Sequence, residues 1–364
     1  MELAGIGPAP FCGMVLADHG ADVIVIDRPS PGALPLPDLA RRGRRSIVID
    51  LKVESGRELA ISLVSGADVL IEGFRPGVAE RLGLGPQVCM DANPRLVYGR
   101  MTGWGQEGPL RDRAGHDIDY ISLAGALGAI GAERPVPPLN LIGDYGGGGL
   151  LLAFGILAAL VEARSTGVGR VVDAAMVDGA ALLMTPIYEM AAAGLWPGER
   201  GSNLLDGGSP FYDTYSTADG EFMAVGALEP QFYAELMDRL GLDADDLPGQ
   251  YDVSGWPQLR DVISRRFAER TRSDWVVVFE GSDACVAPVL SMAEAPGHPH
   301  NSARRLFLDV GGNQLPGPAP RFSGVERQAP EPAPLHGQHT DDVLSELGLS
   351  PAQIGTLRSS GVVR

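Results

Sequence analysis

Cysteine is scarce in this sequence: the 364 residues include only Cys12, Cys89 and Cys285. They are widely spaced and form no CxxC pair. An odd number of isolated cysteines argues against a disulfide framework, and no His, Cys and carboxylate cluster has metal-ligand spacing. We therefore expect free thiols, no metal site and a cytoplasmic protein.

Long apolar segments and a leader sequence are also missing. The longest apolar run, 150–161, is shorter than the ~20 residues that span a bilayer. The N-terminus has no charged segment followed by an apolar one, which predicts that there is no signal peptide. We expect a soluble protein with no membrane partner.

Positive charge is in short supply, with 29 Lys and Arg against 46 Asp and Glu and a net charge of −17. A nucleic-acid partner would require a basic face, so the balance argues against nucleic acid. An anionic small molecule stays compatible, because a few local cations can outweigh the overall sign.

Glycine, in contrast, is abundant, with 49 residues and no collagen-like period. Such an excess indicates turns and close backbone contacts. The hydrophobic content of 45% supports a core, and the length exceeds that of one average domain. The chain should therefore divide into at least two domains.

The first half alternates short apolar runs with helical segments. We expect strands at 21–27, 45–51, 67–71, 96–100 and 169–176, and helices at 10–18, 54–65, 150–165 and 178–193. This alternation predicts parallel strands joined by crossover helices, hence a large, doubly wound, Rossmann-like α/β domain.

The glycines near the start imitate a dinucleotide-binding fingerprint. Gly5 and Gly7 precede a helix, and the acidic Asp27 follows the next strand. However, Pro10 replaces the third glycine, which spoils close helix–strand packing, and the preceding strand is nearly absent. We therefore reject NAD binding and expect no redox cofactor.

The second half has a different pattern of predicted strands and helices. A hairpin at 212–216 and 222–226, helices at 230–240, 256–270 and 273–280, and a strand at 286–290 predict a smaller α+β domain. The Gly-rich segment 194–210 and the Pro-rich segment 316–334 are typical of linkers. The predicted large domain is thus 1–193 with 335–364, which ends in a helix at 340–347 and a second short one, and the small domain is 211–315.

An irregular stretch from 100 to 150 holds the candidate chemistry. His116 and Asp144 lie in it, and Asp144 precedes four glycines. A His and a carboxylate on opposite sides of one carbon could remove a proton from one face and return it on the other, which racemises a centre next to a carbonyl. Spacing alone leaves open that His116 is a surface residue and that Asp144 caps a helix.

Four motifs in and near this stretch carry a resemblance. They are MTGWGQEGP (101–109), GHDIDY (115–120), RPVPPLNLIGDYGGG (134–148) and VDAAMVDG (172–179). They closely resemble the α-methylacyl-CoA racemases, a branch of the family III CoA-transferase (CaiB/BaiF) family. The GD-x-G element and the Arg-Pro-Gly at Arg75 belong to the whole family, and the His of GHD is the more specific mark of the racemase branch.

The resemblance implies a racemase that moves the α-proton of a 2-methylacyl-CoA through an enolate. It assigns His116 and Asp144 as the two bases, Glu229 as the residue that orients His116, and Asn140 as a neighbour of Asp144. We expect backbone N–H groups in a turn at 144–150 to stabilise the enolate, and its glycines to leave room for the thioester.

The resemblance also implies a CoA site, a dimer and an N-terminal strand at the start of the fold. Because the substrate carries coenzyme A, no separate cofactor is expected, and two subunits would interlock as a CaiB/BaiF-type homodimer. Relatives begin with a strand that this sequence nearly lacks, so we expect a misplaced start or an exposed neighbouring strand. The expected CoA-binding residues are Ile6, Arg28, Lys52, Arg75, Arg81, Asp117 and Tyr120.

Two other functions stay open. In a CoA transferase of the same family, the residue matching Asp144 attacks the thioester as a nucleophile. A catalytically silent acyl-CoA-binding protein is the second alternative. The acyl group itself is open among branched fatty acids, sterol side chains and bile-acid intermediates.

Overall fold

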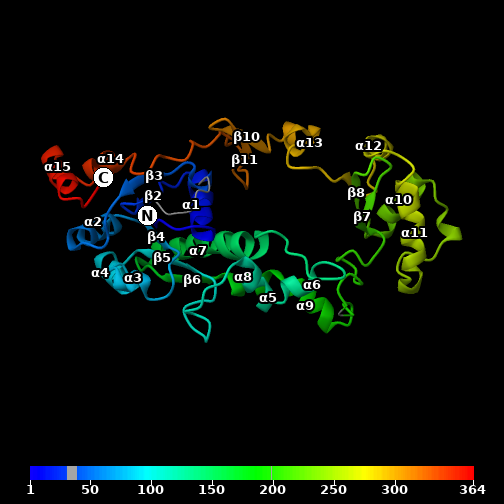
Figure 1. Ribbon diagram of the computed structural model, residues 1–364, viewed down its shortest axis with the longest axis horizontal. Helices are drawn as coiled ribbons and strands as arrows, with labels where there is room; N and C mark the ends of the chain where they lie inside the picture. Colours follow the sequence, from blue (N-terminus) through cyan, green and yellow to red (C-terminus); the bar gives the residue numbers. More distant parts are fainter. Residues whose placement is uncertain (31–38, 198) are drawn as a thin grey trace. The chain divides into compact units, whose positions relative to one another are not determined.

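The computed structural model describes residues 1–30, 39–197 and 199–364, and the chain divides into two compact units (Figure 1). Unit 1 comprises Met1–Gly125, Pro138–Met184 and Ser302–Arg364, and unit 2 comprises Ala126–Pro137 and Thr185–Asn301. Unit 1 therefore includes 302–315, which the sequence assigned to the small domain. In this segment the hairpin of β10 (Phe307–Val310) and β11 (Asn313–Pro316) is fixed by Arg42, whose guanidinium donates to the Pro316 carbonyl at 2.7 Å.

Unit 1 is built on a six-stranded sheet in which every neighbouring pair is parallel. This confirms the predicted doubly wound α/β architecture. All six residues of the long strand β5 are buried, as is typical of a parallel sheet covered on both faces. In spatial order the strands are β3 (Arg45–Val48), β2 (Ile24–Asp27), β1 (Glu2–Leu3), β4 (Val69–Glu72), β5 (Val97–Thr102) and β6 (Val171–Ala175).

The central strand β1 has only two residues. Glu2 and Leu3 pair with β2, and Glu2 also pairs with Ile71 of β4. The Glu2 side chain is buried against Arg44; burial raises the pKa of Glu2, and the Arg44 guanidinium opposes that shift. The position between β2 and β4 is thus filled by a short strand with a buried ion pair beside it.

Helices join these strands, and most begin and end close to the predicted residues. The helix at 54–65 is confirmed at both ends, since α2 spans Glu54–Ser65. The single helix predicted at 178–193 is wrong, because the chain bends at Met184 between α8 and α9. The helical segments of unit 1 are α1 (Pro8–Asp18), η1 (Leu39–Arg41), α2, α3 (Val78–Arg81), α4 (Pro86–Ala92), α5 (Asp117–Leu123), η2 (Leu141–Leu150), α7 (Leu151–Thr166), α8 (Met176–Leu183), α14 (Thr340–Glu346) and α15 (Pro351–Ser359).

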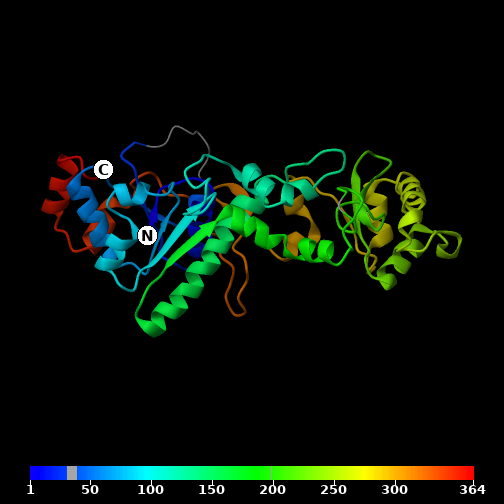
Figure 2. The same cartoon turned by 90° about the horizontal axis from the view of Figure 1, so that it is seen from below.

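Apolar cores cover both faces of the sheet. On one face, Val343 and Leu344 of α14 pack in a cluster with Ile47 of β3 and Leu59 of α2, so the C-terminal helices lie beside early elements (Figure 1). On the other face, α7 runs alongside β5 and β6 (Figure 2) and contributes Ile156 to a second cluster. The C-terminal tail is therefore part of the large α/β unit.

The glycine run after Asp144 forms the π-helix η2, which continues directly into α7. The predicted turn at 144–150 is therefore wrong. An ideal Cβ on Gly179 of α8 would lie 1.9 Å from the Gly147 carbonyl oxygen, and one on Gly149 would lie 2.7 Å from that of Pro8. These glycines are buried against α8 and α1, so they serve close helix packing and do not leave room for a thioester.

Together η2 and α7 make one helix, Leu141–Thr166, that by length and composition could cross a membrane. The apolar run in the sequence looked too short for this because the glycines interrupt it. In the structure, 44% of the most apolar window is buried, and Leu152 and Ile156 belong to the core of the unit. Core helices of globular proteins have the same property.

Unit 2 contains a three-stranded antiparallel sheet covered by helices. The hairpin of β7 (Tyr212–Ser216) and β8 (Phe222–Gly226) is confirmed at both ends, with Gly220 in the left-handed conformation at its turn. Its core includes Trp275, Phe267 and Leu236. The other elements are α6 (Ala126–Ala129), α9 (Thr185–Ala192), α10 (Pro230–Leu240), η3 (Ala244–Asp246), η4 (Val253–Gly255), α11 (Trp256–Phe267), α12 (Arg272–Phe279), β9 (Val286–Pro288), η5 (Ala295–Gly297) and α13 (Pro299–Ala303), which ends in unit 1.

The close contact of η2 with α8 makes a testable prediction. Gly179→Ala should lower the free energy of unfolding by about 1–3 kcal/mol, the usual cost of overpacking, because the new methyl group meets backbone that cannot move aside. Chemical denaturation monitored by circular dichroism measures this. Gly355→Ala in α15 is the control, since nothing lies within 4 Å of its Cβ position. Equal stability of the two variants would contradict the prediction.

Candidate active site

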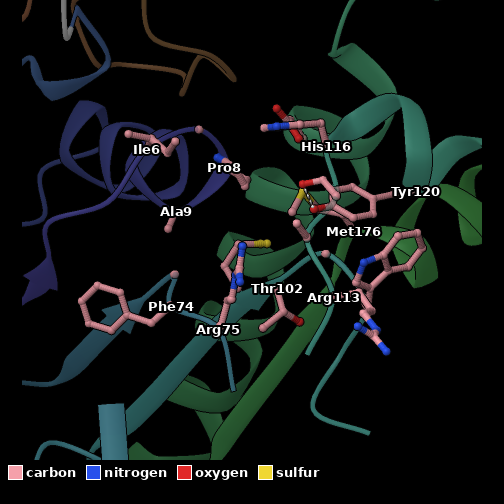
Figure 3. Close-up of a pocket in the computed structure, with 18 of the residues that line it drawn as sticks. Ile6, Pro8, Ala9, Phe74, Arg75, Thr102, Arg113, His116, Tyr120 and Met176 are labelled. Atoms are coloured by element: carbon pink, nitrogen blue, oxygen red, sulfur yellow. Dashed lines mark hydrogen bonds between the residues drawn. The ribbon is translucent and has the colours of Figure 1, made fainter. Parts of the chain in front are cut away.

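A cavity of about 330 Å³ opens in unit 1 where β1, β4 and β5 end. Ligands of open parallel sheets bind at this edge, outside the carboxyl ends of the strands. The side chains converge on it from several loops and helix starts (Figure 3). They include Ile6, Arg75, Trp104, Arg111, Arg113, His116, Tyr120 and Asp144.

His116 lies at the N-cap of α5 and lines the cavity. Its backbone N–H donates a hydrogen bond to Asp119 Oδ2 at 2.9 Å, which fixes the start of the helix. The ring is exposed. An imidazole held at a cavity wall and open to exchange with solvent is suited to accept and release a proton.

Asp144 lies in the first turn of η2 and lines the same cavity. Its Oδ2 accepts a hydrogen bond of 3.0 Å from Asn140 Nδ2. Burial raises the pKa of Asp144; the Asn140 hydrogen bond lowers it, the charge of Asp117 raises it, and that of His116 lowers it. The structure therefore brings together His116, Asp144 and Asn140, and the net effect of these surroundings is a pKa of Asp144 above its ordinary value.

Asp117 was expected to contact CoA, but its carboxylate is used inside the protein. The residue is buried, and its Oδ1 accepts hydrogen bonds from the N–H groups of Gly143 at 2.7 Å and Asp144 at 2.8 Å. These two donors at the start of η2 are consequently occupied. Of the N–H groups at 144–150 that were expected to stabilise an enolate, that of Asp144 is therefore already used within the protein.

Tyr120 forms a rigid wall of the cavity. Its hydroxyl donates to the Gly115 carbonyl, and its ring meets Trp104 edge-on with the centroids 4.7 Å apart. An ideal Cβ on Gly103 would lie 2.2 Å from the ring, so glycine is required there. Burial raises the pKa of Tyr120 to about 12, which keeps the phenol neutral.

Of the four cations expected to bind CoA, only Arg75 lines the cavity. Arg28 and Lys52 are exposed after β2 and β3, and Arg81 ends α3. The sequence reasoning missed Arg111 and Arg113, which do line the cavity. Isolated arginines in a loop are usually solvated, so the sequence offered little reason to choose these two. Only their proximity to the GHD motif could have indicated a place at the site.

The loop that carries Arg75 is held by hydrogen bonds to a buried carboxylate at the end of β4. The buried carboxylate of Glu72 accepts hydrogen bonds from the Phe74 N–H at 2.7 Å and from Arg100 Nε at 2.9 Å. Arg100 also pairs with Glu80 at 2.9 Å. This network fixes the backbone on either side of Gly73 and thereby the place from which Arg75 projects.

Comparisons with known proteins agree with this geometry. The family model described as CoA-transferase family III matches residues 1–340. The chain belongs to that family. It is similar over its whole length to the α-methylacyl-CoA racemases of mouse, 46% identical, and human, 45% identical, and covers 96% of each. A solved structure of a CaiB/BaiF family protein from Brucella suis matches with a TM-score of 0.80 at 27% identity, over 95% of this chain and 97% of that one. The resemblance inferred from the motifs is confirmed.

In this member of the family, Glu229 lies in unit 2 as the exposed N-cap of α10. That is the capping position typical of a residue before a helix-starting proline. Its expected contact with His116 stays a prediction. In the described ranges, no group of three or more His, Cys, Asp or Glu side chains is arranged to hold a metal ion.

The Asn140 hydrogen bond makes a prediction about pH. Asn140→Ala removes a donor that favours the carboxylate, so the pKa of Asp144 should rise. In the direction of reaction that needs ionised Asp144, the acidic limb of the kcat/KM profile should then move to higher pH. Steady-state profiles of the two variants measure the shift, with the exposed Asn313→Ala as control. A shift to lower pH, or the same shift in the control, would contradict this.

Proposed function

We propose that the protein interconverts the (R) and (S) forms of 2-methylacyl-CoA thioesters by two-base proton transfer. The observation that carries the proposal is that His116 and Asp144 line one cavity, where the charge of His116 lowers the pKa of Asp144. The full-length similarity to proteins named α-methylacyl-CoA racemase supports it. The reaction class is therefore isomerisation.

In one direction, the Asp144 carboxylate removes the α-proton of the thioester and an enolate forms. Protonated His116 then delivers its own proton to the opposite face of that carbon. The C–H bond lost on one face is replaced on the other, so no atom or electron is gained. In the reverse direction, neutral His116 is the base and protonated Asp144 is the acid.

The raised pKa of Asp144 serves the half of the cycle in which it must carry a proton. In water an aspartate is almost fully ionised at neutral pH. Burial in the cavity wall increases the protonated fraction, while the Asn140 hydrogen bond keeps the ionised form accessible. Both forms are needed, since each enantiomer meets Asp144 in a different state.

Binding of the CoA portion is proposed at the same sheet edge. Lys52, Arg28, Ile6 and Arg75 follow β3, β2, β1 and β4, which are successive neighbours in the sheet. Cations after adjacent strand ends suit the phosphates of an extended CoA, and Arg111 and Arg113 add positive charge beside the bases. The proposed chemistry uses side-chain bases and needs no further cofactor, and we propose a cytoplasmic location.

The family also supports a second candidate function, transfer of CoA between carboxylic acids. In that reaction the Asp144 carboxylate would attack the thioester carbon, break its C–S bond and form a mixed anhydride as the CoA thiolate leaves. His116 at the cavity wall favours the racemase, because this transfer assigns no task to a base on the opposite face. The two candidates differ in whether the α-proton exchanges with solvent.

The deciding experiment is proton NMR of one enantiomer of a 2-methylacyl-CoA with the purified protein in D₂O. We expect the α-proton signal to disappear as the sample racemises, with no acceptor acid present. Movement of CoA to an added carboxylic acid without α-proton exchange would identify a transferase. Binding with neither reaction would identify a silent acyl-CoA-binding protein.

Variants of the two bases should show opposite bias in single-turnover exchange. His116→Ala should slow exchange from one enantiomer by about 10²–10⁴-fold, the usual contribution of a general acid or base, and affect the other less. Asp144→Ala should show the reverse preference. Unfolding curves serve as controls for the fold, and full activity of both variants with both enantiomers would refute the two-base assignment.

We also propose a homodimer. One side of the continuous helix formed by η2 and α7 exposes four apolar residues at helical spacing, Leu150, Phe154, Leu157 and Val161. An apolar stripe of this kind is typical of a subunit interface. Phe154→Asp should lower the molar mass measured by light scattering from dimer to monomer. Thr166→Asp, on the same helix but turned by about 140° from Val161, should stay dimeric. A monomeric wild type would refute the proposal.

A further inference from the structure

Asp117 connects both proposed bases. Its backbone follows His116 directly, and it is the first residue of α5. Its side chain reaches η2 and accepts the N–H groups of Gly143 and Asp144, at 2.7 and 2.8 Å. A displacement of either helix start is therefore transmitted to the other through this side chain.

The contact is buried and leaves no room for adjustment. Asp117 is only 5% exposed. An ideal Cβ on Gly143 would lie 2.6 Å from Asp117 Oδ1 and 3.2 Å from Ile121 Cγ2. Residue 143 must therefore be glycine for the carboxylate to approach the backbone so closely.

The second carboxylate oxygen distinguishes Asp117 from an ordinary helix cap. Oδ2 is buried and has no hydrogen-bond partner within the described ranges. Burial of an unpaired charged oxygen costs free energy. Fold stability alone does not explain such a residue, whereas a requirement to hold Asp144 in place does.

We infer that Asp117 is a positioning residue, whose Oδ1 sets the place of the Asp144 carboxylate relative to His116. This inference rests on the proposed racemase function. The expected contact of Asp117 with CoA stays a separate prediction. Proton transfer requires the base within hydrogen-bond reach of the carbon, so the separation of the bases has a narrow useful range.

Three variants distinguish the effect of the position of the Asp117 carboxylate from the effect of its charge. Asp117→Asn keeps an acceptor oxygen and loses the charge. Asp117→Glu keeps the charge but adds a methylene group, which pushes the acceptor into η2. Gly143→Ala leaves the charges of Asp117 and Asp144 unchanged, and its new methyl group displaces the Asp117 carboxylate.

We expect Asp117→Glu and Gly143→Ala to lower kcat for racemisation by about 10²-fold, as a misplacement of about 1 Å does, with KM for the thioester little changed. The conservative Asp117→Asn should retain most of the wild-type rate. The controls are Asp91→Asn on the exposed side of α4 and Gly355→Ala in open space, and both should behave as wild type.

Two outcomes would overturn the inference. Wild-type kcat in Asp117→Glu and Gly143→Ala would show that the contact does not set the site. Loss of activity in Asp117→Asn with full activity in Gly143→Ala would assign the role to charge instead of position.

A second measurement tests, without catalysis, whether Asp117 anchors the start of η2 through the Gly143 and Asp144 N–H groups. Amide hydrogen exchange should be slow at Gly143 and Asp144 in the wild type and in Asp117→Asn, and faster in Asp117→Glu. If the wild type failed to exchange the α-proton of any 2-methylacyl-CoA, the proposed function would fail. The amide exchange would still decide whether Asp117 holds η2, and fast exchange in the wild type would refute the anchor.

Discussion

The structure around the candidate site depends on how closely η2 can approach its neighbours. The Gly147–Gly179 contact brings two helix backbones within a distance that no side chain permits, and Gly149 repeats this against Pro8 of α1. Asp144 is carried by the first turn of the same helix. Glycine is costly in a helix because it loses the most conformational freedom on folding. Here that cost is offset by packing that fixes the backbone of a proposed base on two sides.

The cavity combines this rigid wall with a second one at the sheet edge. The Glu72–Arg100 pair holds the loop of Arg75, and Tyr120 fills the space left by Gly103. Buried polar contacts fix part of these walls, and elsewhere a glycine without a side chain lets a neighbouring ring or backbone pack closely. An active site for proton transfer benefits from such support, because the reacting groups must stay within hydrogen-bond reach of one carbon.

Local signals made much of the fold predictable from the sequence. The bounds of α2 and of the β7–β8 hairpin were predicted correctly, since apolar periodicity and the turn residues mark them. The π-helix was not, because a glycine run carries no periodicity and normally indicates a turn. The bend at Met184 was missed although Pro186 is a signal for it, since proline removes a helical hydrogen bond and disfavours helical backbone in the residue before it.

The motifs indicated His116, Asp144 and Asn140, and the structure places these three together. The contacts of Asp117 could not be read in the same way, since its partner Gly143 lies 26 residues further along the chain. Arg111 and Arg113 carry no motif of their own. Sequence reasoning thus identified residues with recognisable chemistry, while long-range contacts determined how the neighbouring residues support them.

The uninterrupted passage from η2 into α7 has a consequence for how the gene can change. Asp144 and the core residues of α7 share one helical axis, so the number of residues between them fixes the direction in which Asp144 points. Deleting or inserting one glycine in the run would turn Asp144 by roughly a quarter of a turn relative to the core face of α7. Chains that descend from this one should therefore tolerate substitution in parts of the run more readily than any change in its length.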